Sequence, residues 1–121
     1  MICNIISVVD DDPLVRDSTV DLVNSLGYTA IGFESAEKFL DSGKVNSTCC
    51  LITDQHLPGL CGTELQKFLR DEGYLTPIIF ISGYPERTVR EYALSAGAIA
   101  FLSKPFEEAV LLNCLQTAFA N

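Results

Sequence analysis

Three kinds of polar side chain that could act together on phosphate follow short apolar runs in this sequence. They are Asp10, Asp11 and Asp12 after residues 5–9, Asp54 after 49–53, Ser82 after 77–81, and Lys104 after 98–102. Several carboxylates in one cleft repel one another and recruit a cation, and oxygen-only ligands favour Mg²⁺ or Mn²⁺ over zinc. A metal, a carboxylate nucleophile, a lysine and a hydroxyl are the parts needed to stabilise a transferring phosphoryl group.

For these groups to meet, the apolar runs must be strands of one sheet. The sequence predicts strands at 5–9, 29–33, 49–53, 77–81 and 98–102. It predicts helices from a cap at Asp11 or Asp12 to Gly27, from a cap at Ser35 to Gly43, and over 63–72, 85–96 and 107–119. Leu14 and Phe68 are among the apolar residues that we expect on the inner faces of these helices.

Alternation of strands and helices indicates an α/β protein with a doubly wound parallel sheet. Right-handed crossovers place functional groups beyond the carboxyl ends of the strands, where all the polar residues above are found. With 121 residues, we expect one domain over positions 1–121.

The charge balance argues against several classes of partner. The net charge is −8, so direct binding to nucleic acid or to an anionic membrane surface is not expected. The apolar amino-terminal stretch runs into Asp10 and is far shorter than the ~20 residues that span a bilayer. We therefore expect a cytoplasmic protein.

The five cysteines, an odd number, show no C-x-x-C spacing, and the sequence has one histidine to complete a zinc site. We interpret the cysteines as free thiols in a reducing compartment.

The order and spacing of four motifs resemble the receiver domains of two-component response regulators. The motifs are VVDDDP at 8–13, LITDQHLPG at 51–59, ISG at 81–83 and FLSKPF at 101–106. Each motif alone is weak, but together they cover essentially the whole chain. SAEKFL at 35–40 and KPFE at 104–107 are most similar to FixJ-type receivers. The resemblance implies a flavodoxin-like (CheY-like) (βα)5 fold with strand order 2-1-3-4-5.

By that resemblance, Asp54 is the phosphoacceptor. Asp10 and Asp11 would hold Mg²⁺, one directly and one through water, with further ligands from Asp54 and the main-chain carbonyl of His56. Mn²⁺ could replace Mg²⁺.

The resemblance also assigns the residues that respond to phosphorylation. Lys104 would contact the phosphoryl group, and its peptide bond to Pro105 is expected to be cis. Ser82 and Phe101 would form the switch pair: the hydroxyl moves towards the phosphate and the ring turns inward.

This chain departs from the usual family pattern at two positions. Gln55 stands where the family usually has an aliphatic residue, and Leu57 where methionine is common. Neither change removes a ligand, but Gln55 could alter access to Asp54 or the kinase-facing surface. His56 and Tyr84 occupy positions that influence how fast the phosphoryl group is lost in the family.

The implied partner is a sensor histidine kinase or a phosphotransfer protein. Such a domain is not a conventional enzyme, although it assists its own phosphorylation and slow dephosphorylation. It would control an output domain or a partner, commonly in transcription. By resemblance to FixJ-type receivers, we expect the face made by helix 85–96, strand 98–102 and helix 107–119 to form a symmetric dimer on phosphorylation, with a monomer in the resting state.

Two other functions remain open from the sequence. Asp10-x-Asp12 is similar to the nucleophile pair of haloacid-dehalogenase-like phosphatases, but Leu14 stands where these have threonine or valine, and no late acidic pair follows the fourth strand. A receiver-like module that works without phosphorylation is the second alternative, although such modules typically lack part of the acidic set. Asp11 or Asp12 alone could simply cap a helix.

Overall fold

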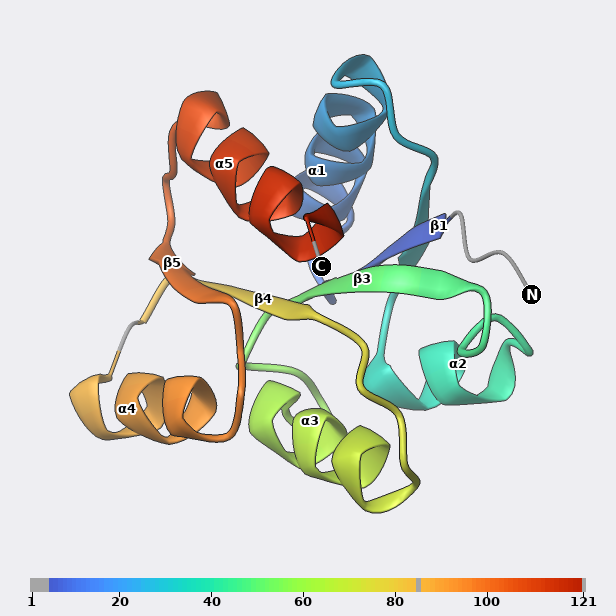
Figure 1. The fold of residues 1–121 in the computed structure, drawn as a ribbon, viewed down its shortest axis with the longest axis vertical. Coiled ribbons are helices and arrows are strands. Elements are labelled where there is room, and N and C mark those ends of the chain that lie inside the picture. Colours follow the sequence, from blue (N-terminus) through green and yellow to red (C-terminus); the bar gives the residue numbers. More distant parts are fainter. Residues whose placement is uncertain (1–4, 85, 121) are drawn as a thin grey trace.

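Five parallel strands form a single sheet in a computed structural model that describes residues 5–84 and 86–120 (Figure 1). The strands are β1 (Ile5–Val9), β2 (Ala30–Phe33), β3 (Thr48–Thr53), β4 (Ile78–Ser82) and β5 (Ala100–Ser103). Their order is β2-β1-β3-β4-β5, and each neighbouring pair is parallel. The predicted doubly wound fold and its strand order are confirmed.

The three inner strands are covered on both sides. Every residue of β3 and β4 is buried, and β1 is buried from its second residue onward. Continuous apolar sequence suits strands that contact helices on both faces of a parallel sheet. The outer strands β2 and β5 are only partly buried, which explains their weaker and shorter apolar runs.

Five helices connect the strands and lie on both faces of the sheet (Figure 1). They are α1 (Pro13–Ser25), α2 (Ala36–Asp41), α3 (Gly62–Asp71), α4 (Arg87–Ser95) and α5 (Glu108–Phe119). The Asp12 carboxylate accepts a hydrogen bond from the N–H of Leu14, so Asp12, rather than Asp11, caps α1. Ser35 caps α2 as predicted. Pro85, where the sequence predicted the fourth helix to begin, lies outside the described residues.

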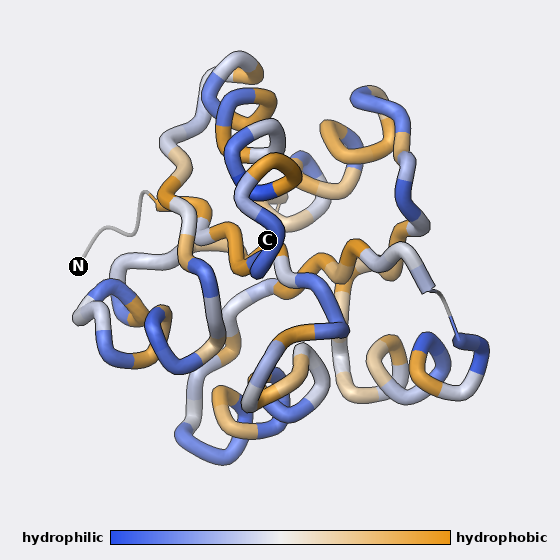
Figure 2. Tube along the Cα trace, turned by 180° about the vertical axis from the view of Figure 1, so that it is seen from behind, coloured by the Kyte–Doolittle hydropathy of each residue, from blue (hydrophilic) through white to orange (hydrophobic). Residues whose placement is uncertain are grey.

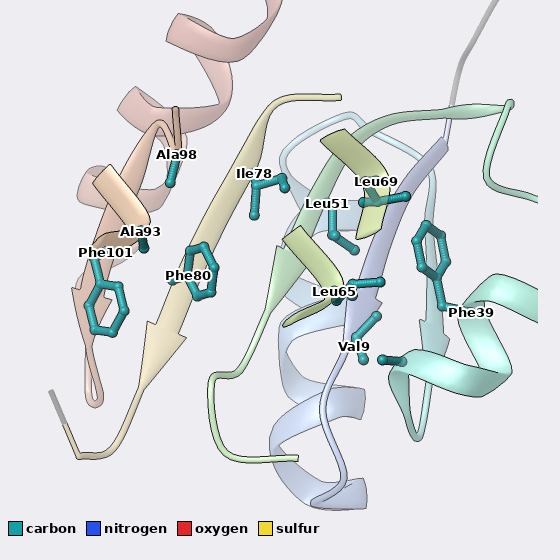
Figure 3. Close-up of a cluster of buried hydrophobic side chains, with 11 residues drawn as sticks. Val9, Phe39, Leu51, Leu65, Leu69, Ile78, Phe80, Ala93, Ala98 and Phe101 are labelled. Carbon is teal, nitrogen blue, oxygen red and sulfur yellow. The ribbon is translucent and has the colours of Figure 1, made fainter. Parts of the chain in front are cut away.

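Helices α2, α3 and α4 cover one face of the sheet, and α1 and α5 cover the other. In the first core, Leu51, Ile78 and Phe80 pack against apolar residues of the three helices (Figure 3). In the second, Ile6, Ile52 and Ile79 pack against α1 and α5, with buried residues Val23, Leu111, Leu115 and Ala118. Along the Cα trace, hydrophobic segments lie on the central strands and alternate with hydrophilic ones in the helices (Figure 2).

Two residues predicted to face inward are exposed instead. Leu14 is 78% exposed and Phe68 is 44% exposed. Successive residues turn by about 100° around a helix, so Leu14 lies roughly 140° from buried Thr19 in α1, and Phe68 roughly 100° from buried Leu69 in α3. Both positions are apolar but fall outside the buried stripe. Leu14 lines an open groove of about 630 Å³ between α1 and the start of α5.

Among the residues that the structure describes, no helix is long and apolar enough to cross a membrane. Cys50, Cys61 and Cys114 carry reduced thiols. Burial raises the pKa of the Cys50 thiol to about 12, which keeps it protonated and unreactive at neutral pH. Cys3 lies outside the described residues.

Candidate functional site

The main chain fixes three predicted site residues directly after their strands. Each donates its backbone N–H to a neighbouring strand, which continues the sheet hydrogen bonding by one residue. The bonds are Asp10 to Phe33 O of β2 at 3.1 Å, Asp54 to Val9 O of β1 at 3.0 Å, and Lys104 to Ser82 O of β4 at 2.9 Å. The sheet therefore sets the spacing between these side chains, as expected at the carboxyl ends of parallel strands.

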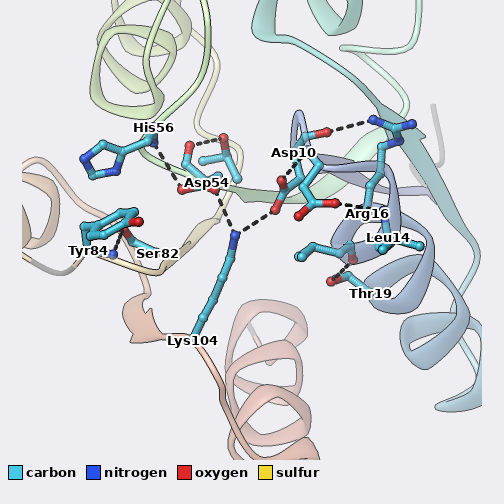
Figure 4. A network of polar contacts seen from close by, with 12 residues as sticks. Asp10, Leu14, Arg16, Thr19, Asp54, His56, Ser82, Tyr84 and Lys104 are labelled. Carbon is cyan, nitrogen blue, oxygen red and sulfur yellow. Dashed lines mark hydrogen bonds and ion pairs between the residues drawn. The ribbon is translucent and has the colours of Figure 1, made fainter.

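Lys104 bridges the two buried carboxylates of this cluster (Figure 4). Its Nζ lies 3.0 Å from Asp10 Oδ2 and 2.9 Å from Asp54 Oδ2. The side chains of Asp10 and Asp54 are 7% and 9% exposed, and that of Lys104 is 22% exposed. Burial by itself lowers the pKa of Lys104, but the hydrogen bonds and charges of Asp54 and Asp10 outweigh it, so the pKa is raised.

Asp10, Asp11 and Asp54 form an acidic cluster. Each offers one carboxylate oxygen, and these oxygens all lie within 4.8 Å of one another. Asp10 and Asp54 are buried, whereas Asp11 is exposed. A set of close carboxylate oxygens with one open side fits a hard divalent cation such as Mg²⁺, which keeps several waters. Asp12 is not part of the cluster, because its carboxylate caps α1.

His56 and Tyr84 lie together on one side of Asp54 (Figure 4). The backbone N–H of His56 donates to Asp54 Oδ1 at 3.1 Å. The His56 ring contacts the Tyr84 ring edge-on, with centroids 5.5 Å apart, and His56 Nε2 lies 3.9 Å from Glu86 Oε1. The structure thus brings the two residues predicted to affect phosphoryl lifetime into contact with each other.

The residues predicted to switch are both buried. The Ser82 hydroxyl accepts a hydrogen bond from the N–H of Tyr84 at 3.1 Å. Phe101 is 7% exposed and stacks on Phe80, with ring centroids 5.4 Å apart. Phe101 is therefore packed into the core on β4. The Lys104–Pro105 peptide bond is cis.

Arg16 is a site residue that sequence reasoning missed. Its guanidinium donates to the carbonyl oxygen of Asp10 at 2.9 Å and so supports the first acidic residue from α1 (Figure 4). The side chain crosses β2 at Gly32, where an added Cβ would lie 3.0 Å from Arg16 Cγ. An arginine in an amphipathic helix gives no sequence signal for this role, because the contact depends on how α1 packs on β2.

Gln55 and Gly62 were also missed as structural residues of the site. The Gln55 side chain bonds to Thr63 at the start of α3. An added Cβ at Gly62 would lie 2.6 Å from the carbonyl oxygen of Asp54. The available signal was a glycine directly before a predicted helix, because glycine often marks a place where another segment of backbone comes close.

Comparison with known proteins agrees with this geometry. The family model of the response regulator receiver domain matches residues 6–116. The response regulator protein TodT of Pseudomonas putida is 36% identical over 115 residues, covering 95% of this chain and 51% of TodT. The transcriptional regulatory protein FixJ of Bradyrhizobium diazoefficiens is 35% identical over 113 residues, covering 93% of this chain and 55% of FixJ.

Solved structures give the same result. The crystal structure of FixJ-N superposes with a TM-score of 0.85 at 31% identity, covering 98% of this chain and 94% of that one. This chain spans about half the length of the curated relatives TodT and FixJ. A family match over most of the chain, with the fold and the acidic cluster in place, shows that the chain belongs to the receiver domains of two-component response regulators.

Proposed function

We propose that this receiver accepts a phosphoryl group on Asp54, with Mg²⁺ bound at the acidic cluster, from a phosphohistidine of a sensor kinase or phosphotransfer protein. The observation that carries the proposal is the setting of Asp54. One carboxylate oxygen bonds to Lys104 and the other to the N–H of His56, within reach of Asp10 and Asp11. These contacts hold a buried carboxylate in one orientation at a cation-binding edge.

In the proposed transfer, an oxygen of Asp54 bonds to phosphorus as the phosphorus–nitrogen bond to the donor histidine breaks. The imidazole leaves with the electron pair of that bond. When bound, Mg²⁺ would neutralise charge on the phosphoryl oxygens. Asp10, Asp11, Asp54 and the His56 carbonyl are the residues that would hold it, and Mn²⁺ suits the same oxygen ligands. Lys104 would bind one phosphoryl oxygen as a fixed positive charge.

Incubation with acetyl phosphate and Mg²⁺, followed by intact mass measurement, tests the acceptor. We expect one added phosphoryl group on the unmodified chain and none on Asp54→Asn. Asp12→Asn is the matched control, because asparagine caps a helix as well as aspartate does and Asp12 is outside the cluster. Full labelling of Asp54→Asn would contradict the proposal.

The same experiment separates the two alternatives. Label that survives in Asp54→Asn but disappears in Asp10→Asn, together with turnover of a phosphate ester, would favour a haloacid-dehalogenase-like phosphatase. An unmodified chain that takes no label, although it binds Mg²⁺, would favour a module that works without phosphorylation.

We further propose that phosphorylation is signalled through the α4–β5–α5 face and controls transcription in the cytoplasm. Ser82 and Lys104 precede α4 and α5, so contacts from either residue to a phosphoryl group would pull on the loops that lead to these helices. Phosphorylation shifts the population only because the active arrangement offers contacts that the inactive one lacks. The relative FixJ is a transcriptional regulatory protein, which supports transcription as the output proposed for this receiver.

A symmetric homodimer is the form that we propose for the active state. The exposed surface of α4 carries mixed charge, but Arg87 and Glu91 already pair within the helix at 3.0 Å. Glu86 lies 3.9 Å from His56 Nε2, and Arg90 adds a further positive charge, so these residues would supply the mixed charge for reciprocal pairs across a twofold axis. Sedimentation with and without beryllofluoride tests this, with a dimer expected only when it is present. A monomer in both conditions would point to a different partner on this face.

A further inference from the structure

We propose that Gln55 is a positioning residue for the metal site, acting by clamping the β3–α3 loop (residues 56–61) that carries the His56 carbonyl. The inference rests on the proposed function, because it treats this carbonyl as a ligand of Mg²⁺. Gln55 follows the phosphoacceptor directly in the sequence, yet its side chain is directed to α3 and not to the reacting atoms.

Both halves of the Gln55 amide bind the same residue. Gln55 Oε1 accepts from the N–H of Thr63 at 2.8 Å, and Nε2 donates to Thr63 Oγ1 at 3.1 Å. The backbone adds a third bond, from the N–H of Gly62 to the carbonyl oxygen of Gln55 at 3.0 Å. Three hydrogen bonds therefore join the residue before the loop to the two residues after it.

The clamp also serves the helix. The first N–H groups of a helix have no partner within it and need one from outside. In α3, Glu64 reaches back to the N–H of Cys61 at 2.9 Å, and Gln55 supplies the acceptor for Thr63. An aliphatic side chain at position 55 would supply neither bond to Thr63. Among the described residues, it would leave the Gly62 N–H bond to the residue-55 carbonyl as the remaining tie between position 55 and α3.

The loop has another anchor at its beginning. The N–H of His56 donates to Asp54 Oδ1, but this carboxylate is also the group that would bind metal and phosphorus. That bond must change whenever the chemistry at Asp54 changes. The Gln55–Thr63 bonds involve no reacting atom, so they can keep the loop in place throughout.

A third support comes from α2 and reaches Leu60, near the end of the loop. Glu37 Oε2 accepts from the N–H of Leu60 at 2.8 Å, which is an exposed contact. It lies farther along the chain from His56 than Gln55 does. We therefore assign the positioning of the His56 carbonyl to Gln55.

Removal of the clamp should weaken Mg²⁺ binding without affecting the chemical step. Residues that orient metal ligands commonly change metal affinity by 10-fold or more when replaced, and we expect about a tenfold increase in the Kd for Mg²⁺ in Gln55→Leu. The rate of labelling by acetyl phosphate at saturating Mg²⁺ should stay at the unmodified value, because Asp54 and Lys104 remain in place. The Mg²⁺ concentration that gives half of the maximal labelling rate should increase by the same factor as the Kd.

The test is calorimetric titration of Mg²⁺ without a phosphodonor, on Gln55→Leu, Thr63→Val and the double variant. Thr63→Val keeps the N–H that binds Gln55 and loses the hydroxyl, so we expect a smaller loss of affinity. The double variant should bind like Gln55→Leu alone, since the hydroxyl acts through the amide. Gln116→Leu, an exposed glutamine on α5, is the matched control and should bind normally.

Three results would overturn the inference. The first is Mg²⁺ binding by Gln55→Leu as tight as in the unmodified chain. The second is a fall in its labelling rate at saturating Mg²⁺ together with its affinity. The third is simple addition of the two single losses in the double variant. If Gln55→Leu does not fold, an unchanged Mg²⁺ affinity in Thr63→Val would overturn the inference instead. If the unmodified chain binds no Mg²⁺, the proposed function fails as well, which distinguishes that case from failure of the clamp alone.

Discussion

Lys104 Nζ lies 2.9 Å from Asp54 Oδ2, although 50 positions separate the two residues in the sequence. The ammonium group also reaches Asp10, so it neutralises part of the negative charge that the acidic cluster concentrates at the sheet edge. A bound Mg²⁺ would compete with Lys104 for the same two carboxylates.

Replacing Lys104 with methionine should lower the stability of the metal-free protein and raise its affinity for Mg²⁺. Loss of the ammonium leaves two buried carboxylates without their partner, which we expect to cost about 1–3 kcal/mol of unfolding free energy. The same loss removes a positive charge beside the cation site, so Mg²⁺ should bind more tightly. Urea unfolding with EDTA and calorimetric titration measure the two effects. Weaker Mg²⁺ binding in Lys104→Met would show that the lysine instead organises the carboxylates.

The contribution of Lys104 to stability should disappear at alkaline pH. Its pKa is raised in the folded protein, so the folded state holds the proton more tightly than the unfolded state does. The stabilisation is then fully present below the unfolded lysine pKa of about 10.4 and is lost as the pH rises through the higher folded value. In EDTA, the difference in unfolding free energy between the unmodified chain and Lys104→Met should be constant from neutral pH and shrink above about pH 10. A difference that stays constant across that range would contradict the ion-pair account.

The positions of the catalytic-type side chains could be predicted because they depend on sheet topology. β1 has the predicted bounds, and β3 differs from the prediction by one residue. These strands could be located because a strand buried on both faces requires a continuous run of apolar residues. Once the strands are parallel, Asp10, Asp54 and Lys104 must share one edge. That step requires no knowledge of side-chain packing.

The supporting contacts could not be predicted in the same way. The Arg16 contact with Asp10 depends on how α1 packs on β2, and the Gln55 contact with Thr63 depends on where α3 begins. Many other polar residues of the chain have the same local sequence pattern. Leu14 and Phe68 show the converse problem, because an apolar residue at the margin of a helical stripe has no sequence mark of its exposure. The sequence therefore predicted which polar groups meet at the sheet edge, but not the residues that hold them in place.

Gly62→Ala should destabilise the protein and disturb the position of Asp54. An added Cβ would lie 2.6 Å from the carbonyl oxygen of Asp54 and 2.9 Å from the Phe80 ring, so one of them must move. Overpacking of this kind costs about 1–3 kcal/mol. Gly83→Ala is the matched control, because a Cβ there meets no atom within 4 Å, and we expect a change within about 0.5 kcal/mol. Urea unfolding measures the free energy of unfolding of both variants. Equal stability of the two would show that the first turn of α3 can shift to accommodate the added methyl group at little cost.

The last prediction concerns Gln66, a buried glutamine at the contact between α3 and α4. Its Nε2 donates to the carbonyl oxygen of Ala93 at 3.0 Å. Its Oε1 is buried and, among the described residues, has no hydrogen-bond donor. The Ala93 carbonyl has a second partner in the N–H of Ala98 at 3.0 Å, so it stays bonded if the Gln66 amide is removed.

Gln66→Leu should therefore leave stability unchanged or raise it by about 1 kcal/mol, because it removes an unsatisfied buried oxygen at little cost in packing. Gln66→Ala is the comparison that isolates volume, and we expect it to lose about 2–3 kcal/mol by leaving a cavity. Chemical unfolding of the two variants separates the effects. A loss above 2 kcal/mol in Gln66→Leu, equal to that in Gln66→Ala, would mean that the bond to Ala93 is a principal tie between α3 and α4.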